Sequence, residues 1–285
     1  TPLKFSLSGW SRSRGGTSVY FLISEGYLAG SFSDELNLFL TPELAPLGSY
    51  DSEYVTNYEL GFKGTFRDGR VVLNAEVFWM DYTDKQESIL LDNSDGRYGP
   101  DPNIELNQNA GQVDIYGIEL ELRTSPWDGA FITVDEGYLI NECNSFLAAD
   151  PVNPGEFIDR SQQNINDRTP DWTLNASVGH SFVMGSGAQL TTTLGVYVQG
   201  GYEWLGETLL SDPKSYCLYH SYSKFRARVS FQPASAKWEA SLFGSNITDE
   251  RYYEECNSSR TGIYDYRYGN PDSRGLEFVA RFCNN

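Results

Sequence analysis

The chain has 285 residues, 14% of them aromatic, yet its mean hydropathy is −0.44, so many large rings coexist with a polar average. Its 39 acidic and 21 basic residues give a formal net charge of −18 at pH 7. This balance argues against a nucleic-acid partner, because phosphate binding needs a basic surface. No apolar run approaches the roughly 18 residues of a membrane-spanning helix.

Alternation of apolar and polar residues predicts strands along nearly the whole sequence, and we count about eleven such segments. They cover residues 3–10, 18–30, 57–66, 71–84, 113–124, 131–140, 172–182, 190–204, 219–231, 238–246 and 274–282. Helical periodicity is not competitive over any useful length. The chain is therefore predicted to be all-β and antiparallel, with one continuous region over residues 1–285.

The connections between these segments alternate between short and long. Short ones contain turn residues: SRSRGG (11–16), RDGR (67–70), SPWDGA (125–130), GSGAQ (185–189) and PASAK (233–237). Long ones, rich in Asp, Asn, Gly, Pro and Tyr, lie near 31–56, 85–112, 141–171, 205–218 and 247–273. Tight turns at one end and long polar loops at the other are typical of a transmembrane β-barrel.

Aromatic residues lie at both ends of the apolar strand faces. Toward the long loops these are Tyr58, Trp79, Tyr116 and Trp172; toward the short turns they are Phe66, Phe182, Phe231, Trp238 and Phe282. From residue 172 to residue 182 is roughly 33 Å of strand, or roughly 25 Å of height at a tilt near 40°. That matches the apolar band of an outer-membrane barrel, so these rings are predicted to form two girdles against outer-membrane lipid.

The first complete hairpin makes the prediction specific. A two-residue turn at Asp68-Gly69 would pair Tyr58 with Trp79 and leave the charged residues on the opposite face, toward a watery lumen. Alternation alone would also fit a soluble secreted module that binds carbohydrate or mediates adhesion. A chain that stays monomeric without detergent would favour this alternative.

Six segments resemble one known family. VYFLISEGYLAGSF (19–32), SEYVTNYELGFKG (52–64), VVLNAEVFWMDYTDKQ (71–86), IYGIELEL (115–122), SLFGSNITDERYY (241–253) and SRGLEFVARF (273–282) look like the C-terminal barrel region of TonB-dependent outer-membrane receptors. The resemblance implies a Gram-negative outer-membrane receptor, not an enzyme, that imports a ferric siderophore or another scarce nutrient with energy from TonB. It implies no cofactor.

Barrels of this family have about 22 strands, so this chain resembles the second half of one. The plug, the TonB-binding segment and the first strands are expected to lie outside this sequence. An open half-barrel leaves two unpaired edges, so the chain alone is not expected to transport anything. Such barrels usually end on the terminal aromatic residue, whereas Cys283, Asn284 and Asn285 follow it here.

Residues on the lumen face of the strands, near the long loops, are candidates for ligand binding. They are Tyr82, Tyr197, Gln199, His220 and Tyr222. Acidic loops such as SDELN (33–37) and TDERYYEE (248–255) leave open a cationic ligand or divalent ions between lipid headgroups. No nucleophile with a base is evident. The abundant carboxylates are expected to pair with Arg and Lys on neighbouring strands rather than to catalyse.

The chain has four cysteines, Cys143, Cys217, Cys256 and Cys283, with no CxxC pair and hence no zinc-site spacing. They allow two disulfides in any of three connectivities, or free thiols. Cys143, Cys217 and Cys256 fall in long loops at the same end of the predicted barrel. One surface disulfide among these three is therefore expected.

Overall fold

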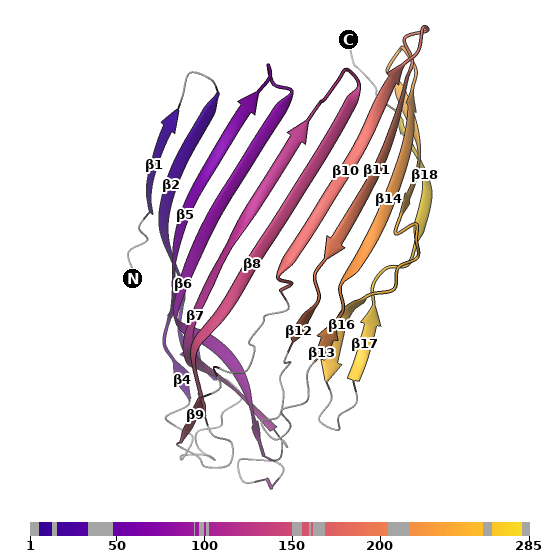
Figure 1. Ribbon diagram of the computed structural model, residues 1–285. Coiled ribbons are helices and arrows are strands. Elements are labelled where there is room, and N and C mark those ends of the chain that lie inside the picture. The colour runs from indigo at the N-terminus through magenta and orange to yellow at the C-terminus, as the bar shows by residue number, and fades with distance from the viewer. Residues whose placement is uncertain are drawn as a thin grey trace.

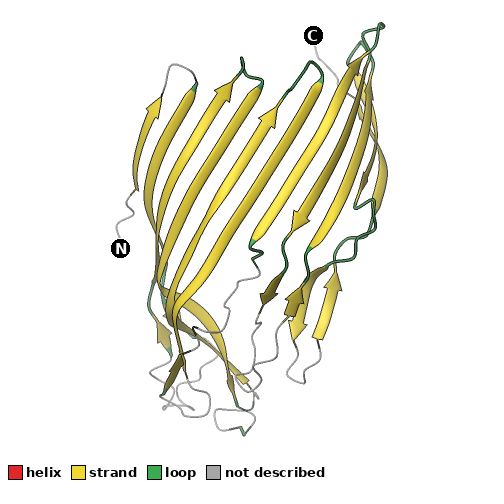
Figure 2. Cartoon of the chain, in the orientation of Figure 1, coloured by secondary structure: helices red, strands yellow, loops and turns green. Residues whose placement is uncertain are grey.

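The computed structural model describes residues 6–12, 16–33, 48–93, 95–96, 100, 103–149, 156–159, 161, 169–204, 217–258 and 264–280. Within these ranges the chain forms strands, turns and loops (Figures 1 and 2). None of them contains a helix long and apolar enough to span a membrane. The predicted all-β class is confirmed.

One antiparallel sheet of twelve strands dominates the described part of the chain. Along its path lie β1 (Ser6–Arg12), β2 (Thr17–Leu28), β5 (Glu53–Phe66), β6 (Val71–Asp92), β7 (Asn103–Thr124), β8 (Ala130–Ala149), β10 (Trp172–Val183), β11 (Gln189–Gln199), β14 (Tyr222–Gln232), β15 (Trp238–Ser245) and β18 (Ser273–Ala280). The short strand β9 (Phe157–Asp159) pairs with β8. Each predicted segment overlaps one strand of this path, in the predicted order.

The sheet is curved and its strands are tilted, with the short turns at the top of Figure 1 and the long connections at the bottom. Each strand of the path pairs with its neighbours in sequence along that path, so the described sheet runs from β1 to β18 as an open wall. Three further pairs lie at the long-loop end: β3 (Ser31–Phe32) with β4 (Ser49–Tyr50), β12 (Tyr202–Trp204) with β13 (Cys217–Tyr219), and β16 (Tyr253–Ser258) with β17 (Tyr264–Tyr268).

The β5–β6 hairpin has the predicted register. Tyr58 pairs with Trp79, and the backbone N–H of Arg70 donates to the carbonyl of Arg67 at 3.1 Å. The strand ladder ends at the pair Phe66–Val71, and Arg67, Asp68 and Gly69 have φ angles of 52°, 55° and 87°. Positive φ at both central residues is what a type I′ turn requires, and its twist matches that of the flanking strands. The Asp-Gly pair therefore fixes which side chains face each side of the wall.

One face of the wall is a continuous apolar surface. Leu60, Val77 and Ile118 lie side by side on β5, β6 and β7 and are 51%, 45% and 52% exposed. The row continues in register through Tyr138 on β8 to Trp172 on β10. Val178 on β10 and Leu194 on β11 form a further apolar pair on the same face. A soluble sheet would bury such a row under a second layer. Here the alternation instead suits lipid on one side and a polar lumen on the other.

The opposite, lumen-facing surface holds polar side chains that bond to one another across strands. Arg123 on β7 donates to Asp135 on β8 at 2.8 Å, and Arg226 on β14 donates to Asn175 on β10 at 2.8 Å. Lateral bonds of this kind satisfy polar groups along the wall. As expected from sequence, many carboxylates therefore have a basic or amide partner.

Several large lumen-facing side chains lie flat across the wall because the residue opposite is glycine. Tyr20 pairs with Gly61, where an added Cβ would come within 2.1 Å of the tyrosine ring. Arg226 similarly covers Gly195, where a Cβ would lie 2.6 Å from its Nε. These close approaches keep large side chains against the sheet and out of the lumen.

The strands extend further toward the long loops than their alternating pattern predicts. β6, β7 and β8 are 22, 22 and 20 residues long. The registers shift near Tyr82 on β6 and at Gln112 on β7, and Asp84 has a φ of 55°. These bulges interrupt the face alternation, so the sequence pattern breaks where the backbone pairing continues.

Candidate functional site

The ends of β11 and β14 bring three of the predicted ligand-binding residues together at the long-loop end of the lumen face. Gln199 pairs directly with Tyr222 in the sheet register. The hydroxyls of Tyr197 and Tyr222 donate to Gln199 Oε1 at 2.9 and 3.0 Å, and the two rings lie 6.0 Å apart. The amide oxygen thus aligns both phenols on one side of the wall.

Lys224, two residues along β14, lies within this group. Its Nζ is 5.3 Å from the ring centroids of Tyr197 and Tyr222 and 4.3 Å from that of Tyr252. The ammonium also donates to the Tyr252 hydroxyl at 3.1 Å. An ammonium over tyrosine faces is attracted by the ring quadrupole, so three rings hold the charge in one position.

Tyr252 comes from the connection between β15 and β18 and is only 7% exposed. Its ring stacks on Tyr222 at 4.3 Å and covers Gly269, where a Cβ would lie 2.1 Å from the ring. The Gly269 N–H donates to the Tyr252 carbonyl at 2.9 Å. These contacts hold a loop residue against the wall.

A turn at the end of β15 sets the path of this connection. Asn246 has a φ of 48° and is 4% exposed. Its amide donates to the carbonyls of Glu250 at 2.9 Å and Asn270 at 3.4 Å and accepts from the Glu250 N–H at 2.9 Å. Asn tolerates the left-handed conformation better than most residues, and its side chain closes the turn.

These residues surround an open pocket of about 520 Å³, which we call the rim pocket. It is lined by Asn175, Tyr197, Tyr222, Lys224, Phe225, Arg226, Ser245, Asn246, Tyr252, Asn270 and Pro271. Its size falls in the range of small-molecule sites. Its lining offers phenols, amides and two cationic groups.

Beyond the rim pocket, the small sheets β12–β13 and β16–β17 lie next to each other (Figure 1) and share a small core. Tyr219 stacks on Tyr202 at 4.4 Å, and its hydroxyl oxygen accepts from the Cys256 N–H at 2.9 Å. Tyr253 packs on Tyr266 at 4.5 Å, and Cys256 is fully buried and disulfide-bonded. We call these two sheets the rim unit, since two long connections join in it.

The pKa of Tyr253 in the rim unit is raised, first by its hydrogen bond with Tyr268 and then by that residue's charge. The raised pKa extends the pH range over which this phenol stays neutral beyond the ordinary limit near 10.

The other two predicted ligand-binding residues, His220 and Tyr82, do not line the rim pocket. His220 is exposed between β13 and β14. Tyr82 lies on β6, separated from β11 by β7, β8 and β10. Sequence reasoning missed Lys224 and Tyr252 as members of the site. Lys224 shares its strand face with Tyr222, which was a usable signal, whereas the return of Tyr252 onto the wall had no local signal.

A free Cys143 is compatible with the expectation of one disulfide among three cysteines, but the residue lies on a strand rather than in a long loop. Cys143 is a free thiol on β8, where its Sγ donates to the Ser145 carbonyl at 3.5 Å. It cannot join a disulfide with the rim unit because β10, β11, β14 and β15 separate β8 from the end of the wall. The side chains of Cys217 and Cys283 lie outside the described residues.

The residues predicted for the outer girdle, Tyr58, Trp79 and Tyr116, lie inside β5, β6 and β7, because these strands continue beyond them toward the long loops. Toward the long loops, Tyr58 stacks on Trp79 at 5.1 Å, and Trp79 pairs with Tyr116. The Trp79 indole N–H donates to Asp114 at 2.7 Å and the Tyr116 hydroxyl to Glu142 at 2.7 Å. Trp172, at the start of β10, is 38% exposed.

Toward the short turns, Phe66 is the last residue of β5 and Phe182 the penultimate residue of β10, and the ring of Phe231 lies 5.7 Å from that of Trp238. Phe282 lies outside the described residues. The girdle role remains a prediction. The polar partners of Trp79 and Tyr116 are consistent with it, because rings in such belts turn their polar end toward water.

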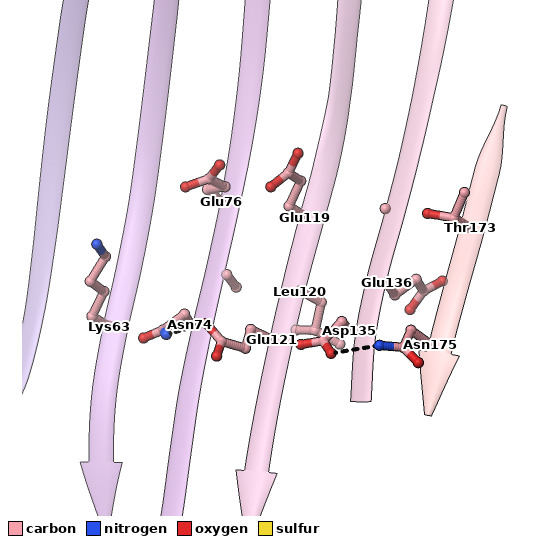
Figure 3. A pocket seen from close by; sticks show the side chains of 12 residues that line it. Lys63, Asn74, Glu76, Glu119, Leu120, Glu121, Asp135, Glu136, Thr173 and Asn175 are labelled. Carbon is pink, nitrogen blue, oxygen red and sulfur yellow. Dashed lines mark hydrogen bonds between the residues drawn. The ribbon is translucent and has the colours of Figure 1, made fainter. Parts of the chain in front are cut away.

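A second pocket, of about 440 Å³, lies on the wall nearer the middle (Figure 3). It is lined by Lys63, Asn74, Ala75, Glu76, Glu119, Leu120, Glu121, Asp135, Glu136, Gly137, Thr173 and Asn175. The Asn74 amide donates to Glu121 at 2.8 Å and the Asn175 amide to Asp135 at 3.4 Å. In contrast to the rim pocket, this surface is strongly acidic.

Comparison with known proteins agrees with this architecture. Residues 9–247 match the family model described as TonB dependent receptor-like, beta-barrel. The fold is similar to the ferric yersiniabactin uptake receptor of Yersinia pestis, with 17% identity over 98% of this chain and 37% of that chain and a TM-score of 0.66. It is also similar to the pyoverdine outer membrane receptor of Pseudomonas aeruginosa bound to pyoverdine, with 18% identity, coverage of 98% and 36%, and a TM-score of 0.67.

A third solved structure, the ferric preacinetobactin receptor of Acinetobacter baumannii, has 14% identity, coverage of 96% and 36%, and a TM-score of 0.63. The chain spans about a third of the length of these solved receptors. At such low identity the likeness concerns the fold, whereas the family model matches most of the residues. The chain therefore belongs to the TonB-dependent receptor-like β-barrel family of the Gram-negative outer membrane.

Proposed function

We propose that this chain supplies part of the wall and of the extracellular rim of a receptor that takes up a ferric siderophore by TonB-driven active transport. The rim pocket carries the proposal. It is a ligand-sized site of phenols, amides and cationic groups at the long-loop end of a membrane wall. A nutrient arriving from outside would meet this end first.

The comparisons support the nutrient class. Receptors with the same fold take up ferric yersiniabactin, bind pyoverdine or bind ferric preacinetobactin, according to their descriptions. In this proposal TonB acts through a plug region outside these 285 residues, and the wall contributes binding surface rather than chemistry. The soluble carbohydrate-binding module is disfavoured, because the apolar row on the outer face would then need a second layer.

Uptake of radioactive iron tests the proposal. A strain that lacks the complete receptor should take up less ⁵⁵Fe from a panel of siderophore chelates than the parent strain, in iron-limited medium. Restoring the receptor should restore uptake, and dissipating the inner-membrane proton gradient should abolish it while leaving binding at 0 °C intact. Growth in iron-rich medium is the control. Equal uptake by both strains for every chelate would refute the proposed function.

A further inference from the structure

We propose that the rim pocket selects a ligand with net negative charge, and that Lys224 is the residue that determines this preference. The inference rests on the proposed function and adds a substrate class to it. It depends on the charge of the pocket lining, the fixed position of one ammonium group and the contrast with the rest of the lumen wall.

The charge of the rim pocket is opposite to that of the chain. The chain carries a formal charge of −18, yet the pocket lining contains Lys224 and Arg226 and no Asp or Glu. Just outside the lining, the Glu254 carboxylate accepts from the Tyr252 hydroxyl at 3.4 Å. Acidic groups instead gather in the second pocket, around Glu76 and Glu119. An anion at the rim thus meets attraction, and repulsion begins further down the wall.

The geometry of Lys224 explains why a cationic ligand would not take this place. Cages of aromatic faces commonly bind ligand cations. Here the tyrosine cage already surrounds an ammonium that belongs to the protein, at 4.3 Å from the Tyr252 ring. A second cation would therefore meet a like charge. The inference therefore disfavours, for this pocket, the cationic ligand that the acidic loops leave open.

Lys224 also has donor capacity for a ligand. An ammonium has three N–H bonds, of which the Tyr252 hydroxyl accepts one. The cage fixes the long lysine side chain, so an incoming anion would not have to order it. Arg226 is held by Asn175 and lies across Gly195, which keeps a second positive charge on the same surface.

Three substitutions in the complete receptor test the inference, with ⁵⁵Fe binding to whole cells at 0 °C as the assay. The probes are an iron(III) tris-catecholate, which is trianionic, an uncharged iron(III) trihydroxamate and a cationic iron(III) trihydroxamate. Lys224→Gln is expected to weaken binding of the trianion about tenfold and Lys224→Glu about a hundredfold. Lys224→Arg should stay within about threefold, since it keeps the charge. Binding of the uncharged chelate should change less than about twofold.

Lys63→Gln is the matched control. Lys63 is another lumen-facing lysine over a tyrosine, with its Nζ 5.1 Å from the Tyr20 ring, but it lies in the acidic pocket on β5. Its loss should leave all three affinities unchanged. Surface amounts of each variant, measured by antibody, correct for folding.

The outcomes separate the two proposals. A wild-type receptor that binds no chelate in the panel would refute the proposed function and this inference with it. A receptor that binds the uncharged or cationic chelate in preference to the anion would leave uptake standing and overturn charge selection. Charge selection by Lys224 would also be refuted if Lys224→Glu lost affinity equally for all three chelates, or if its preference among them were the same as that of the wild type.

Discussion

Replacing Leu194 by arginine should destabilise the receptor far more than the same change at Thr193. Leu194 is 60% exposed on the outer face, and Thr193 lies on the lumen face beside it. Leu194 is four residues from Leu190, which pairs with Phe182, and this distance is roughly 13 Å of strand. At a tilt near 40° it is about 10 Å of height in a band about 25 Å tall, so Leu194 lies near the middle.

An arginine facing lipid at that depth costs about 2–4 kcal/mol, whereas one facing a watery lumen costs little. Thr193 pairs with Arg228, so Thr193→Arg adds a like-charge penalty of at most about 1 kcal/mol. The difference should appear as a lower urea midpoint and a smaller folded fraction of Leu194→Arg in lipid vesicles. The folded fraction can be read from the mobility of unheated samples on gels. Equal effects, or a larger effect at Thr193, would show that the two faces are assigned wrongly.

Two further predictions concern the long-loop end. Without reductant, iodoacetamide should label Cys143 and not Cys256, which should react only after reduction. Burial raises the pKa of the Cys143 thiol, so its alkylation rate should keep rising as the pH passes the ordinary cysteine pKa of about 8.5. Label on Cys256 before reduction would contradict this. Asn246→Ala removes the side-chain bonds to Glu250 and Asn270 and should cost about 1–3 kcal/mol locally. Protease cleavage in the following loop should then accelerate roughly fivefold or more, and unchanged cleavage would refute the role of this turn.

The membrane wall could be predicted from sequence because lipid and water impose opposite demands on alternate residues. Tyr58 and Trp79 pair as expected, since the Asp68-Gly69 turn leaves one register that keeps apolar side chains together. The same alternation placed Lys224 on the face of Tyr222. The alternation within a single strand is therefore enough to predict which of its side chains face lipid and which face the lumen.

The extensions of the strands could not be predicted in the same way. β6 continues to Asp92 and β8 to Ala149, beyond the outer aromatic residues. There both faces meet water and other loops, so no alternation is required, and the bulge near Tyr82 shifts what remains of it. The small sheets of the rim unit likewise depend on contacts between segments that are distant in the sequence.

The rim pocket combines these two kinds of information. The β11–β14 register fixes the face on which Lys224 projects. A shift of this register by one residue would turn apolar side chains away from the lipid, so the register is constrained. Tyr252 reaches the same ammonium only because Asn246 and Gly269 hold its loop against the wall. A loop substitution could remove the Tyr252 ring and leave the wall intact, whereas the lysine would keep its position. Charge preference should therefore be the more durable property of the pocket, and the shape of the ligand should be the property that loop changes alter.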